Sequence, residues 1–504
     1  MTTYLLGIDV GTYSSKGVVT DLQGRIMASA SVPHTISITV AGQVEQDAEL
    51  VWWHDVCTLS QSLLAQTGID AVQIAGVAVS AIGPCLLPLD ADMRPLRPAI
   101  LYGVDVRAER EIVELEAAIG KPEVLQFCKM AFTSQAIGPK ICWLKKHEPQ
   151  HWEATSLLTS ASGYLVFKLT GQHRMDRHTA SHYMPLYNPE THEWDARYAD
   201  LVCPLSLLPP LAWADEIAGV MSAQAALETG LAAGTPVAVG TVDALSEALS
   251  VGVVTPGDMM VMYGSTSFFI GIQDRATPDP RVWCVDGLSA GQKNLAAGMS
   301  TTGSLTRWFM DEFCHELDPA TGYTQLFSAA TKIAPGCDGL LVLPYFSGER
   351  SPINDSKARG EIVGLTLSHT RDHIFRAILE GVGFGIRHNL EAFQAIGARF
   401  DRLVAVGGGA QSMLWLQIIS DITGVAQLVP AITLGAAYGD AFLAGQALGL
   451  LRQGQINDWV EPERMIQPNP SNKARYDFLY AHYLRLYEST KTLVHALGDA
   501  YQAG

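Results

Sequence analysis

The stretch from residue 5 to residue 24, LLGIDVGTYSSKGVVTDLQG, restricts the fold more than any other part of the sequence. Two short apolar runs flank a segment rich in Gly, Ser and Thr, and this pattern predicts two strands joined by a tight turn. Asp9 then lies at the end of a buried strand. An unpaired carboxylate is costly there, whereas a cation or a set of hydrogen-bond donors would compensate it. The position therefore indicates a ligand.

The residues of the turn have the chemistry of a phosphate site. Gly11 allows the backbone to approach a ligand closely. The turn's N–H groups would then be joined by three hydroxyls and one positive charge, supplied by Thr12, Ser14, Ser15 and Lys16. An ordinary polar hairpin accounts for the same residues, and because neither a GxxxxGK[ST] nor a GxGxxG pattern is present, this stretch alone leaves both interpretations open.

The hairpin pattern occurs a second time, in Val261–Ile272 (VMYGSTSFFIGI). Two hairpins of one design predict duplicated halves. A nucleotide between them would have its phosphates held from both sides, which predicts an active site in a cleft between two domains. The Pro-Gly pair at 256–257 marks the crossing, so we expect an N-terminal domain over 1–250 and a C-terminal domain over 251–504.

Charge and composition exclude several classes of function. The 504 residues contain 34 Lys and Arg against 51 Asp and Glu, a net charge of −17, and no dense basic run, so nucleic acid is not an expected partner. No apolar run is long enough for a membrane helix, and the eight cysteines form no CxxC pair. We expect a soluble, cytoplasmic protein without a membrane partner.

Asp243 is the most chemically suggestive carboxylate. It follows a predicted buried strand, Val237–Val239, and opens a predicted helix. At a helix N-terminus it would stay ionised and could accept a proton from a substrate hydroxyl. A helix N-cap needs the same type of residue, so both interpretations stay open.

Other segments suggest contacts with ligands. Asp105 and Arg107 could bind a polyol through complementary acceptors and donors, or form a surface ion pair. Gly83 and Pro84 lie in a break between two predicted strands and could line a pocket. Three glycines at 407–409 follow a predicted strand and could admit a base or ribose, although a simple turn is the more common role of such a triplet. The small-residue segment Leu434–Ala447 predicts a helix suited to close helix–helix approach at a hinge.

Taken together, these segments resemble the FGGY carbohydrate kinases, over nearly the whole chain. The most specific part is Gly360–Glu380, GEIVGLTLSHTRDHIFRAILE, which fits the family's second signature. Lys140 begins a segment, KICWL, that is similar to the first signature. SGERSP and VGGGAQSMLWLQIISDITG are similar to the family's loop and adenosine segments.

The resemblance implies an α/β fold with two ribonuclease-H-like domains, as in the actin and hexokinase superfamily, and ATP bound with Mg²⁺ in the interdomain cleft. By position, Asp243 matches the catalytic base, and Asp9 together with Asp243 matches the metal site. Asp105 and Arg107 align with the W-x-D-x-R substrate motif, although Tyr102-Gly103-Val104 stands where a Trp often does. The implied nucleotide-binding residues are Thr12, Ser14, Ser15, Lys16, Gly264, Ser265, Thr266, Gly303, Gly408, Gly409 and Ala410.

One departure affects the substrate. Xylulose kinases usually have Gln-Met-His-Gly, and glycerol kinases Gln-Arg-Glu, where this chain has Ala81-Ile82-Gly83-Pro84. We therefore expect a xylulose kinase-like enzyme that phosphorylates a ketopentose such as D-xylulose, with a broader or different range than a dedicated xylulose kinase. Ribulose, glycerol or gluconate kinases are the alternatives, as is a catalytically silent nucleotide-dependent binding protein. The expected partners are the sugar and ATP, and a homodimer is the assembly considered.

Overall fold

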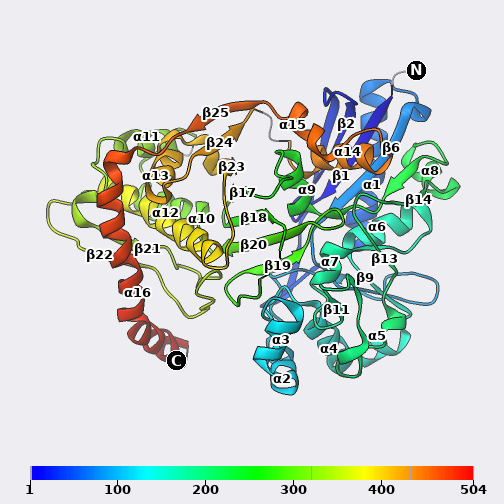
Figure 1. Ribbon diagram of the computed structural model, residues 1–504, viewed down its shortest axis with the longest axis horizontal. Helices are drawn as coiled ribbons and strands as arrows, with labels where there is room; N and C mark the ends of the chain where they lie inside the picture. The colour runs from blue at the N-terminus through cyan, green and yellow to red at the C-terminus, as the bar shows by residue number, and fades with distance from the viewer. Residues whose placement is uncertain (1–2, 276, 319, 432–433, 503–504) are drawn as a thin grey trace. The chain divides into compact units, whose positions relative to one another are not determined.

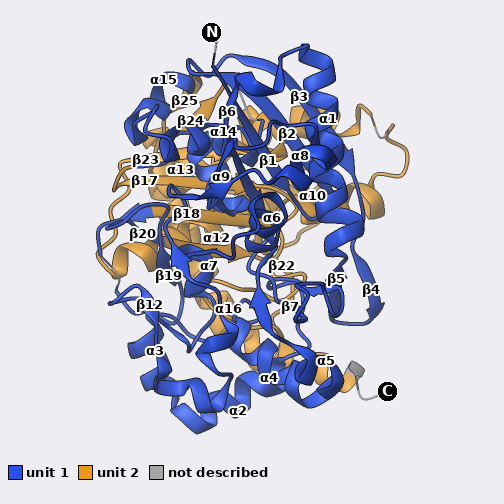
Figure 2. Cartoon of the chain, turned by 90° about the vertical axis from the view of Figure 1, so that its right-hand side faces the viewer, with its two compact units in different colours: residues 1–254, 272–294, 434–461 blue, residues 255–271, 295–433, 462–504 orange. Residues whose placement is uncertain are grey.

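The structure, a computed structural model, describes residues 3–275, 277–318, 320–431 and 434–502. It is a mixed α/β fold with two seven-stranded sheets that helices cover (Figure 1). Contacts divide the chain into two compact units (Figure 2). Unit 1 comprises residues 1–254, 272–294 and 434–461, and unit 2 comprises 255–271, 295–433 and 462–504. The predicted α/β class is confirmed.

The first sheet has the order β14-β15-β6-β1-β2-β3, with β16 paired to β6. β1 and β2 form the predicted antiparallel hairpin, in which Asp9 faces Lys16 in register. β6 and β15 continue the sheet in parallel, as buried strands do between two layers of helices. The strands are β1 Tyr4–Val10, β2 Ser14–Asp21, β3 Ile26–Pro33, β6 Ile74–Ala81, β14 Ile217–Val220, β15 Pro236–Ala238 and β16 Thr241–Val242.

Helices cover both faces of this sheet, and alternate residues of the hairpin show which helix lies on which face. A Cβ on Gly7 would lie 2.0 Å from the backbone oxygen of Ala437 in α14 (Ala436–Ala447). A Cβ on Gly17 would instead lie 2.8 Å from Leu63 in α1 (His54–Thr67). Asp9, two residues after Gly7, therefore points to the α14 side.

The other helices of unit 1 complete its core and carry the loops. α6 packs on β6, β14 and β15, and α9 packs on α14. The helices are α2 Glu109–Ile119, α3 Lys121–Cys128, α4 Ile137–His147, α5 Pro149–Ala154, α6 Ala161–Thr170, α7 Arg177–Ser181, α8 Ala223–Thr229, α9 Asp243–Ser250 and α15 Ile456–Trp459.

The second sheet has the order β19-β20-β18-β17-β23-β24-β25 and repeats the local design of the first. β17 pairs antiparallel with β18 and parallel with β23, as β1 does with β2 and β6. The expectation of a duplicated hairpin is confirmed. The strands are β17 Asp258–Tyr263, β18 Ser267–Gln273, β19 Trp283–Asp286, β20 Lys293–Met299, β23 Arg402–Val406, β24 Gln427–Pro430 and β25 Pro462–Ile466.

Unit 2 is organised around α12, a helix of 25 residues that is buried along most of its middle. It contacts α10, α11, α13 and the short strand β21 (Leu341–Leu343), which pairs with β22 (Glu361–Val363). The helices are α10 Gly303–Phe313, α11 Gly322–Ala330, α12 Arg371–Ala395, α13 Met413–Thr423 and α16 Lys473–Gln502.

The units are discontinuous in sequence, whereas the sequence-based division at residue 250 is continuous. Residues 272–294 and 434–461 pack with unit 1 although they follow the first strand of the second sheet. The proposed domains 1–250 and 251–504 stay a prediction about folding units, and α14 is the element that such a division would separate from its packing partners.

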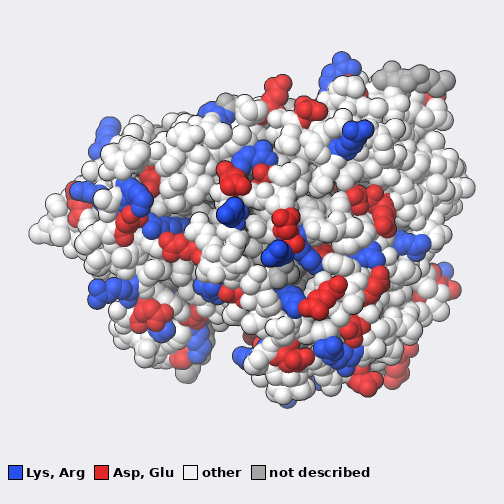
Figure 3. All heavy atoms as spheres, viewed as in Figure 1, with Lys and Arg blue, Asp and Glu red and all other residues white. Residues whose placement is uncertain are grey.

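The surface shown in Figure 3 mixes acidic and basic side chains over the described residues, without one large field of either sign. Among the described residues, no helix combines the length and the apolar character needed to cross a bilayer.

The packing of α14 on β1 generates the first prediction. We expect Gly7→Ala to lower the free energy of unfolding by ~3 kcal/mol or more, because the new methyl group would collide with backbone atoms that cannot move separately. Gly454→Ala is the matched control, since a Cβ there meets nothing within 4 Å. Urea denaturation of both variants measures the effect, and equal stability of the two would contradict the packing.

Candidate active site

Four carboxyl groups gather on the α14 side of the first sheet. Asp9 is the second-last residue of β1, Asp243 and Glu247 belong to the first two turns of α9, and Asp440 belongs to α14. Asp9 and Asp440 are buried, whereas Asp243 and Glu247 keep part of their surface open. Sequence analysis singled out Asp9 and Asp243 as candidate site residues but missed Glu247 and Asp440.

Electrostatics make this group of carboxylates unusual. Burial raises the pKa of Asp9 well above its ordinary value, and Asp243, Asp440 and Glu247 raise it further, while Lys16 lowers it. Burial also raises the pKa of Asp243 to about 7, against the N–H of Ala244. Burial raises the pKa of Asp440 and of Glu247 in the same way. The cause is shared: water is removed from several like charges, and the positive charge of Lys16 offsets them only in part.

The residues present fit a divalent cation. Oδ1 of Asp9 is buried and has no hydrogen-bond partner among the described residues. Within the same described part of the chain, no three His, Cys, Asp or Glu side chains converge on one metal position. Mg²⁺ commonly takes only one or two carboxylates and completes its shell with water and phosphate oxygens. Asp9 and Asp243 are the side chains that would hold it.

The geometry at the opening of α9 bears on the two interpretations of Asp243, both of which stay predictions. Val242, not Asp243, is the N-cap residue, and it has no capping side chain. Asp243 is the first helical residue, and its Oδ1 accepts a hydrogen bond of 2.7 Å from the following N–H of Ala244. Its other oxygen stays available, so the geometry favours the proton-acceptor interpretation over capping.

The first hairpin divides its polar residues between the two faces of the sheet. Lys16 is exposed and lies with Glu247 beside Gly435, at the start of α14. Thr12 Oγ1 lies 3.2 Å from the hydroxyl of Tyr102, and Ser14 is partly exposed. These placements leave the predicted phosphate-binding role open to all three side chains.

Ser15 points the other way. Its side chain is buried on the α1 side, where Oγ donates a 2.7 Å hydrogen bond to Asp55, which also bonds His34. Successive residues of a strand alternate between faces, so the Ser15 hydroxyl lies on the face opposite to Asp9 and its neighbouring carboxyl groups. Only its backbone remains a candidate for phosphate binding.

The second hairpin is joined to the beginning of α10. The carbonyl of Gly264 accepts from the N–H of Gly303 at 2.9 Å, and the carbonyl of Ser265 accepts from Thr302 and Ser304 at 2.9 and 3.1 Å. A Cβ on Gly303 would lie 2.7 Å from the oxygen of Gly264, so glycine is required there. The hydroxyls of Ser265 and Thr266 stay exposed.

A pocket of about 860 Å³ lies beside this hairpin, entirely within unit 2. The predicted nucleotide residues Gly264, Ser265, Gly303, Gly408 and Gly409 line it, whereas Thr266 and Ala410 do not. Sequence analysis missed its aromatic and hydroxyl wall, which comes from α11 and the start of α13 and includes Tyr323, Thr324, Phe327, Ser328 and Trp415. The pocket is large enough for a nucleoside and offers flat apolar surfaces together with polar groups.

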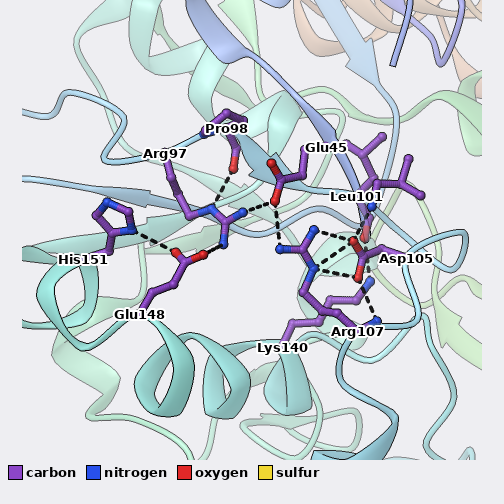
Figure 4. Close-up of polar contacts among 10 residues, drawn as sticks. Glu45, Arg97, Pro98, Leu101, Asp105, Arg107, Lys140, Glu148 and His151 are labelled. Atoms are coloured by element: carbon purple, nitrogen blue, oxygen red, sulfur yellow. Dashed lines mark hydrogen bonds and ion pairs between the residues drawn. The ribbon is translucent and has the colours of Figure 1, made fainter. Parts of the chain in front are cut away.

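Asp105 and Arg107 are directed toward each other (Figure 4). Their side chains are 0% and 1% exposed and form hydrogen bonds of 2.7–3.0 Å, and the backbone N–H of Arg107 donates to Asp105 at 3.1 Å. Arg107 also lies 2.8 Å from Glu45. The second oxygen of Asp105 accepts from the N–H of Val44 at 2.7 Å. The pair is thus a buried clamp that ties its own loop to the strand β5 (Gln43–Gln46). The geometry favours this role over direct polyol binding, which stays a prediction.

Lys140 supports the same loop. Its ammonium is buried and donates to the carbonyls of Leu101 and Tyr102 at 2.5 and 2.8 Å (Figure 4). Burial lowers the pKa of Lys140 to about 8, against the opposing effect of Asp105. Lys140, the lysine of the first signature, therefore fixes the backbone at Leu101 and Tyr102. The hydroxyl of Tyr102 in turn lies next to Thr12.

Gly83 and Pro84 lie next to the strand that leads into α9. A Cβ on Gly83 would lie 2.4 Å from Cγ1 of Val242, the residue before Asp243. Pro84 is buried. The break between β6 and β7 (Leu87–Leu89) is therefore packed against the start of α9, which keeps the predicted substrate-side role geometrically open.

Comparisons with known proteins agree with this geometry. Two family models match, "FGGY family of carbohydrate kinases, N-terminal domain" over residues 4–250 and "FGGY family of carbohydrate kinases, C-terminal domain" over 259–448. The crystal structure of xylulose kinase from Rhodospirillum rubrum superposes with a TM-score of 0.92 at 30% identity, covering 98% of this chain and 100% of that one. The predicted fold of two family domains is confirmed.

Two curated relatives differ in the sugar that they are named for. Xylulose kinase of Lactococcus lactis subsp. lactis (strain IL1403) is 28% identical, with 100% of both chains covered. Ribulokinase of Geobacillus thermodenitrificans (strain NG80-2) is 27% identical, with 96% of this chain and 94% of the relative covered.

The clamp generates a prediction that separates support from substrate binding. We expect Arg107→Ala to lower the free energy of unfolding by ~3 kcal/mol or more, because it leaves the carboxylate of Asp105 buried and unpaired. Arg110→Ala is the matched control: its side chain is 85% exposed and pairs with Glu114 at the surface, so we expect a change within ~0.5 kcal/mol. Chemical denaturation measures both, and unchanged stability of Arg107→Ala would favour direct substrate binding by the pair.

Proposed function

Because the chain belongs to the FGGY family of carbohydrate kinases, we propose that it transfers the γ-phosphoryl group of ATP to a primary hydroxyl of a small sugar, with a ketopentose such as D-xylulose as the leading substrate. The single observation that carries the proposal is the pair Asp9 and Asp243, which lie close enough in unit 1 for the charge of Asp243 to raise the pKa of Asp9.

Asp243 is the proposed general base. A carboxylate with a pKa of about 7 is matched to accepting the proton of a sugar hydroxyl near neutral pH, better than an ordinary aspartate would be. Its hydrogen bond to Ala244 fixes one oxygen and leaves the other for the substrate. Mg²⁺, when bound by Asp9 and Asp243, would neutralise charge on the phosphate oxygens, which is the main requirement of phosphoryl transfer.

The nucleotide has a proposed place in unit 2. The pocket beside Gly264 and Gly303 would take the adenosine, with Phe327 and Trp415 as the flat apolar walls. In unit 2, the turn N–H groups of the second hairpin would bind phosphate oxygens, because such groups suit anions. In unit 1, the turn of the first hairpin together with Lys16 has the same chemistry. Thr12, Ser14 and Lys16 are the proposed contributors from the first hairpin.

Two observations support the proposed sugar: the substrates for which the relatives are named, and the apolar segment Ala81-Ile82-Gly83-Pro84. Xylulose kinases and a ribulokinase resemble this chain at 27–30% identity. Ala81, Ile82 and Pro84 are buried, and their side chains carry no polar group. An apolar wall rejects an additional or inverted hydroxyl only weakly. We therefore propose a broad ketopentose kinase, with ribulose as the next acceptor.

A panel of acceptors tests the proposal. ADP release is measured with Mg²⁺ and ATP in the presence of D-xylulose, D-ribulose, L-ribulose, glycerol and gluconate, each against a blank without acceptor. We expect D-xylulose to stimulate turnover most and a ribulose to follow within ~10-fold in kcat/KM, the range in which an apolar wall discriminates. If no acceptor raises turnover above the blank, the protein is a nucleotide-dependent binding protein and not this kinase.

Asp243→Asn tests the base directly. We expect kcat to fall by ~100-fold or more, because the amide cannot accept the proton, with little change in stability since the helix start is preserved. Asp372→Asn is the control, an equivalent change in the first turn of α12, and it should leave kcat unaltered. Near-normal kcat in Asp243→Asn would remove Asp243 from the chemistry.

A further inference from the structure

Asp440 is the one charged residue in α14, whose sequence is AAYGDAFLAGQA. The helix otherwise consists mainly of small and apolar residues and is buried over most of its length. The Asp440 side chain is 0% exposed. A carboxyl group that is withdrawn from water needs compensating donors.

Two serines supply these donors, and they come from two different elements. Ser80 Oγ in β6 donates to Oδ2 of Asp440 at 2.6 Å. Ser246 Oγ in α9 donates to Oδ1 at 2.6 Å. Both serines are 0% exposed, so they have no water to exchange for this bond. One carboxyl group therefore ties α14 to a strand and to a helix at the same time.

The two elements that Asp440 ties together carry the proposed catalytic pair or adjoin it. Ser80 is the register partner of Asp9 across the parallel pair β1–β6. Ser246 lies three residues after Asp243 and therefore on the same side of α9, about one turn further on. The hydrogen bonds of Asp440 to Ser80 and to Ser246 therefore connect the strand next to Asp9 with the helix that carries Asp243.

Close backbone packing makes this link stiff. A Cβ on Gly439 would lie 2.0 Å from the backbone oxygen of Ser246, and a Cβ on Gly7 would lie 2.9 Å from Cβ of Asp440. α14 therefore touches α9 and β1 on either side of the carboxyl group. A polar group fixed at such a junction resists sliding of one element past another, because its bonds have direction and apolar contacts do not.

We propose that Asp440 is a positioning residue of the phosphoryl-transfer reaction, which sets the separation of Asp243 from Asp9 through its bonds to Ser246 and Ser80. The inference rests on the proposed function for its catalytic meaning. Asp440 does not touch the substrate in this arrangement and acts through the two serines.

Two substitutions at 440 separate this role from simple packing. Asp440→Ala removes both hydrogen bonds and introduces alanine, a residue that already occurs several times in α14. Asp440→Asn keeps both, since the amide oxygen accepts from one serine while the amide N–H donates to the hydroxyl of the other. We expect kcat of Asp440→Ala to fall by at least ~10-fold, because a misplacement on the order of 1 Å at a reacting group is that costly, with KM for ATP within ~3-fold. Asp440→Asn should keep kcat within ~3-fold of the original enzyme.

A double variant tests the route. If Asp440 acts through Ser246, the variant Asp440→Ala/Ser246→Ala should be no slower than Asp440→Ala alone, because the shared link is already lost. Independent, multiplying losses in kcat would overturn the route. Asp258→Asn is the control for disturbing a buried carboxyl group, because Asp258 in unit 2 accepts three hydrogen bonds of 2.8–3.1 Å. It should shift the denaturation midpoint without shifting kcat.

Crystal structures give a readout that does not depend on activity. Asp440→Ala should change the separation of the Asp9 and Asp243 carboxyl groups by more than ~0.5 Å relative to the original protein, the tolerance of a working site. An unchanged separation overturns the proposal. A variant Asp440→Ala that keeps a normal kcat and only has a lower melting temperature overturns it too. If the original protein phosphorylates no acceptor, the proposed function fails while the crystallographic comparison still decides whether Asp440 positions Asp243.

Discussion

Repulsion among carboxyl groups that have lost their water is the constraint on which unit 1 depends. Burial raises the pKa of all four carboxyl groups, which belong to Asp9, Asp243, Glu247 and Asp440. The other three also raise the pKa of Asp9 by their charge, whereas Lys16 lowers it. Such a cluster is stable only if protons, a cation or directed hydrogen bonds offset it. The rigid contacts of α14 with β1 and α9 hold the groups together against that repulsion.

Local pattern predicted the parts of this arrangement that are local in sequence. Both hairpins, the strand before α9 and the helix beginning at Asp243 lie where the apolar runs and turn residues placed them. The family resemblance then connected them into two related domains, which the match to a solved structure supports over 98% of the chain. Asp9 was identifiable because a carboxylate at the end of a buried strand is costly unless a ligand or a set of donors compensates it.

The errors and omissions concern contacts between distant residues and the faces of strands. Ser15 belonged to the right turn but to the wrong face, since a one-residue step in a strand reverses the side chain. For Asp105 and Arg107 the sequence left polyol binding and a surface ion pair open; the structure shows an ion pair that is buried instead of exposed, and polyol binding stays a prediction. Asp440 lies 360 positions from Ser80 in sequence, and no local pattern pairs them. A lone carboxylate in a helix of small residues was the available signal.

The return of residues 434–461 to unit 1 also orders events on the ribosome. The strands of the first sheet are complete by Val242, yet α14 emerges only after most of unit 2 has been made. Until α14 has been made, the side of β1 that carries Gly7 and Asp9 lacks the helix that buries it. The dry cluster of carboxyl groups can therefore form only after α14 is available, so it cannot be the nucleus around which a growing unit 1 first folds.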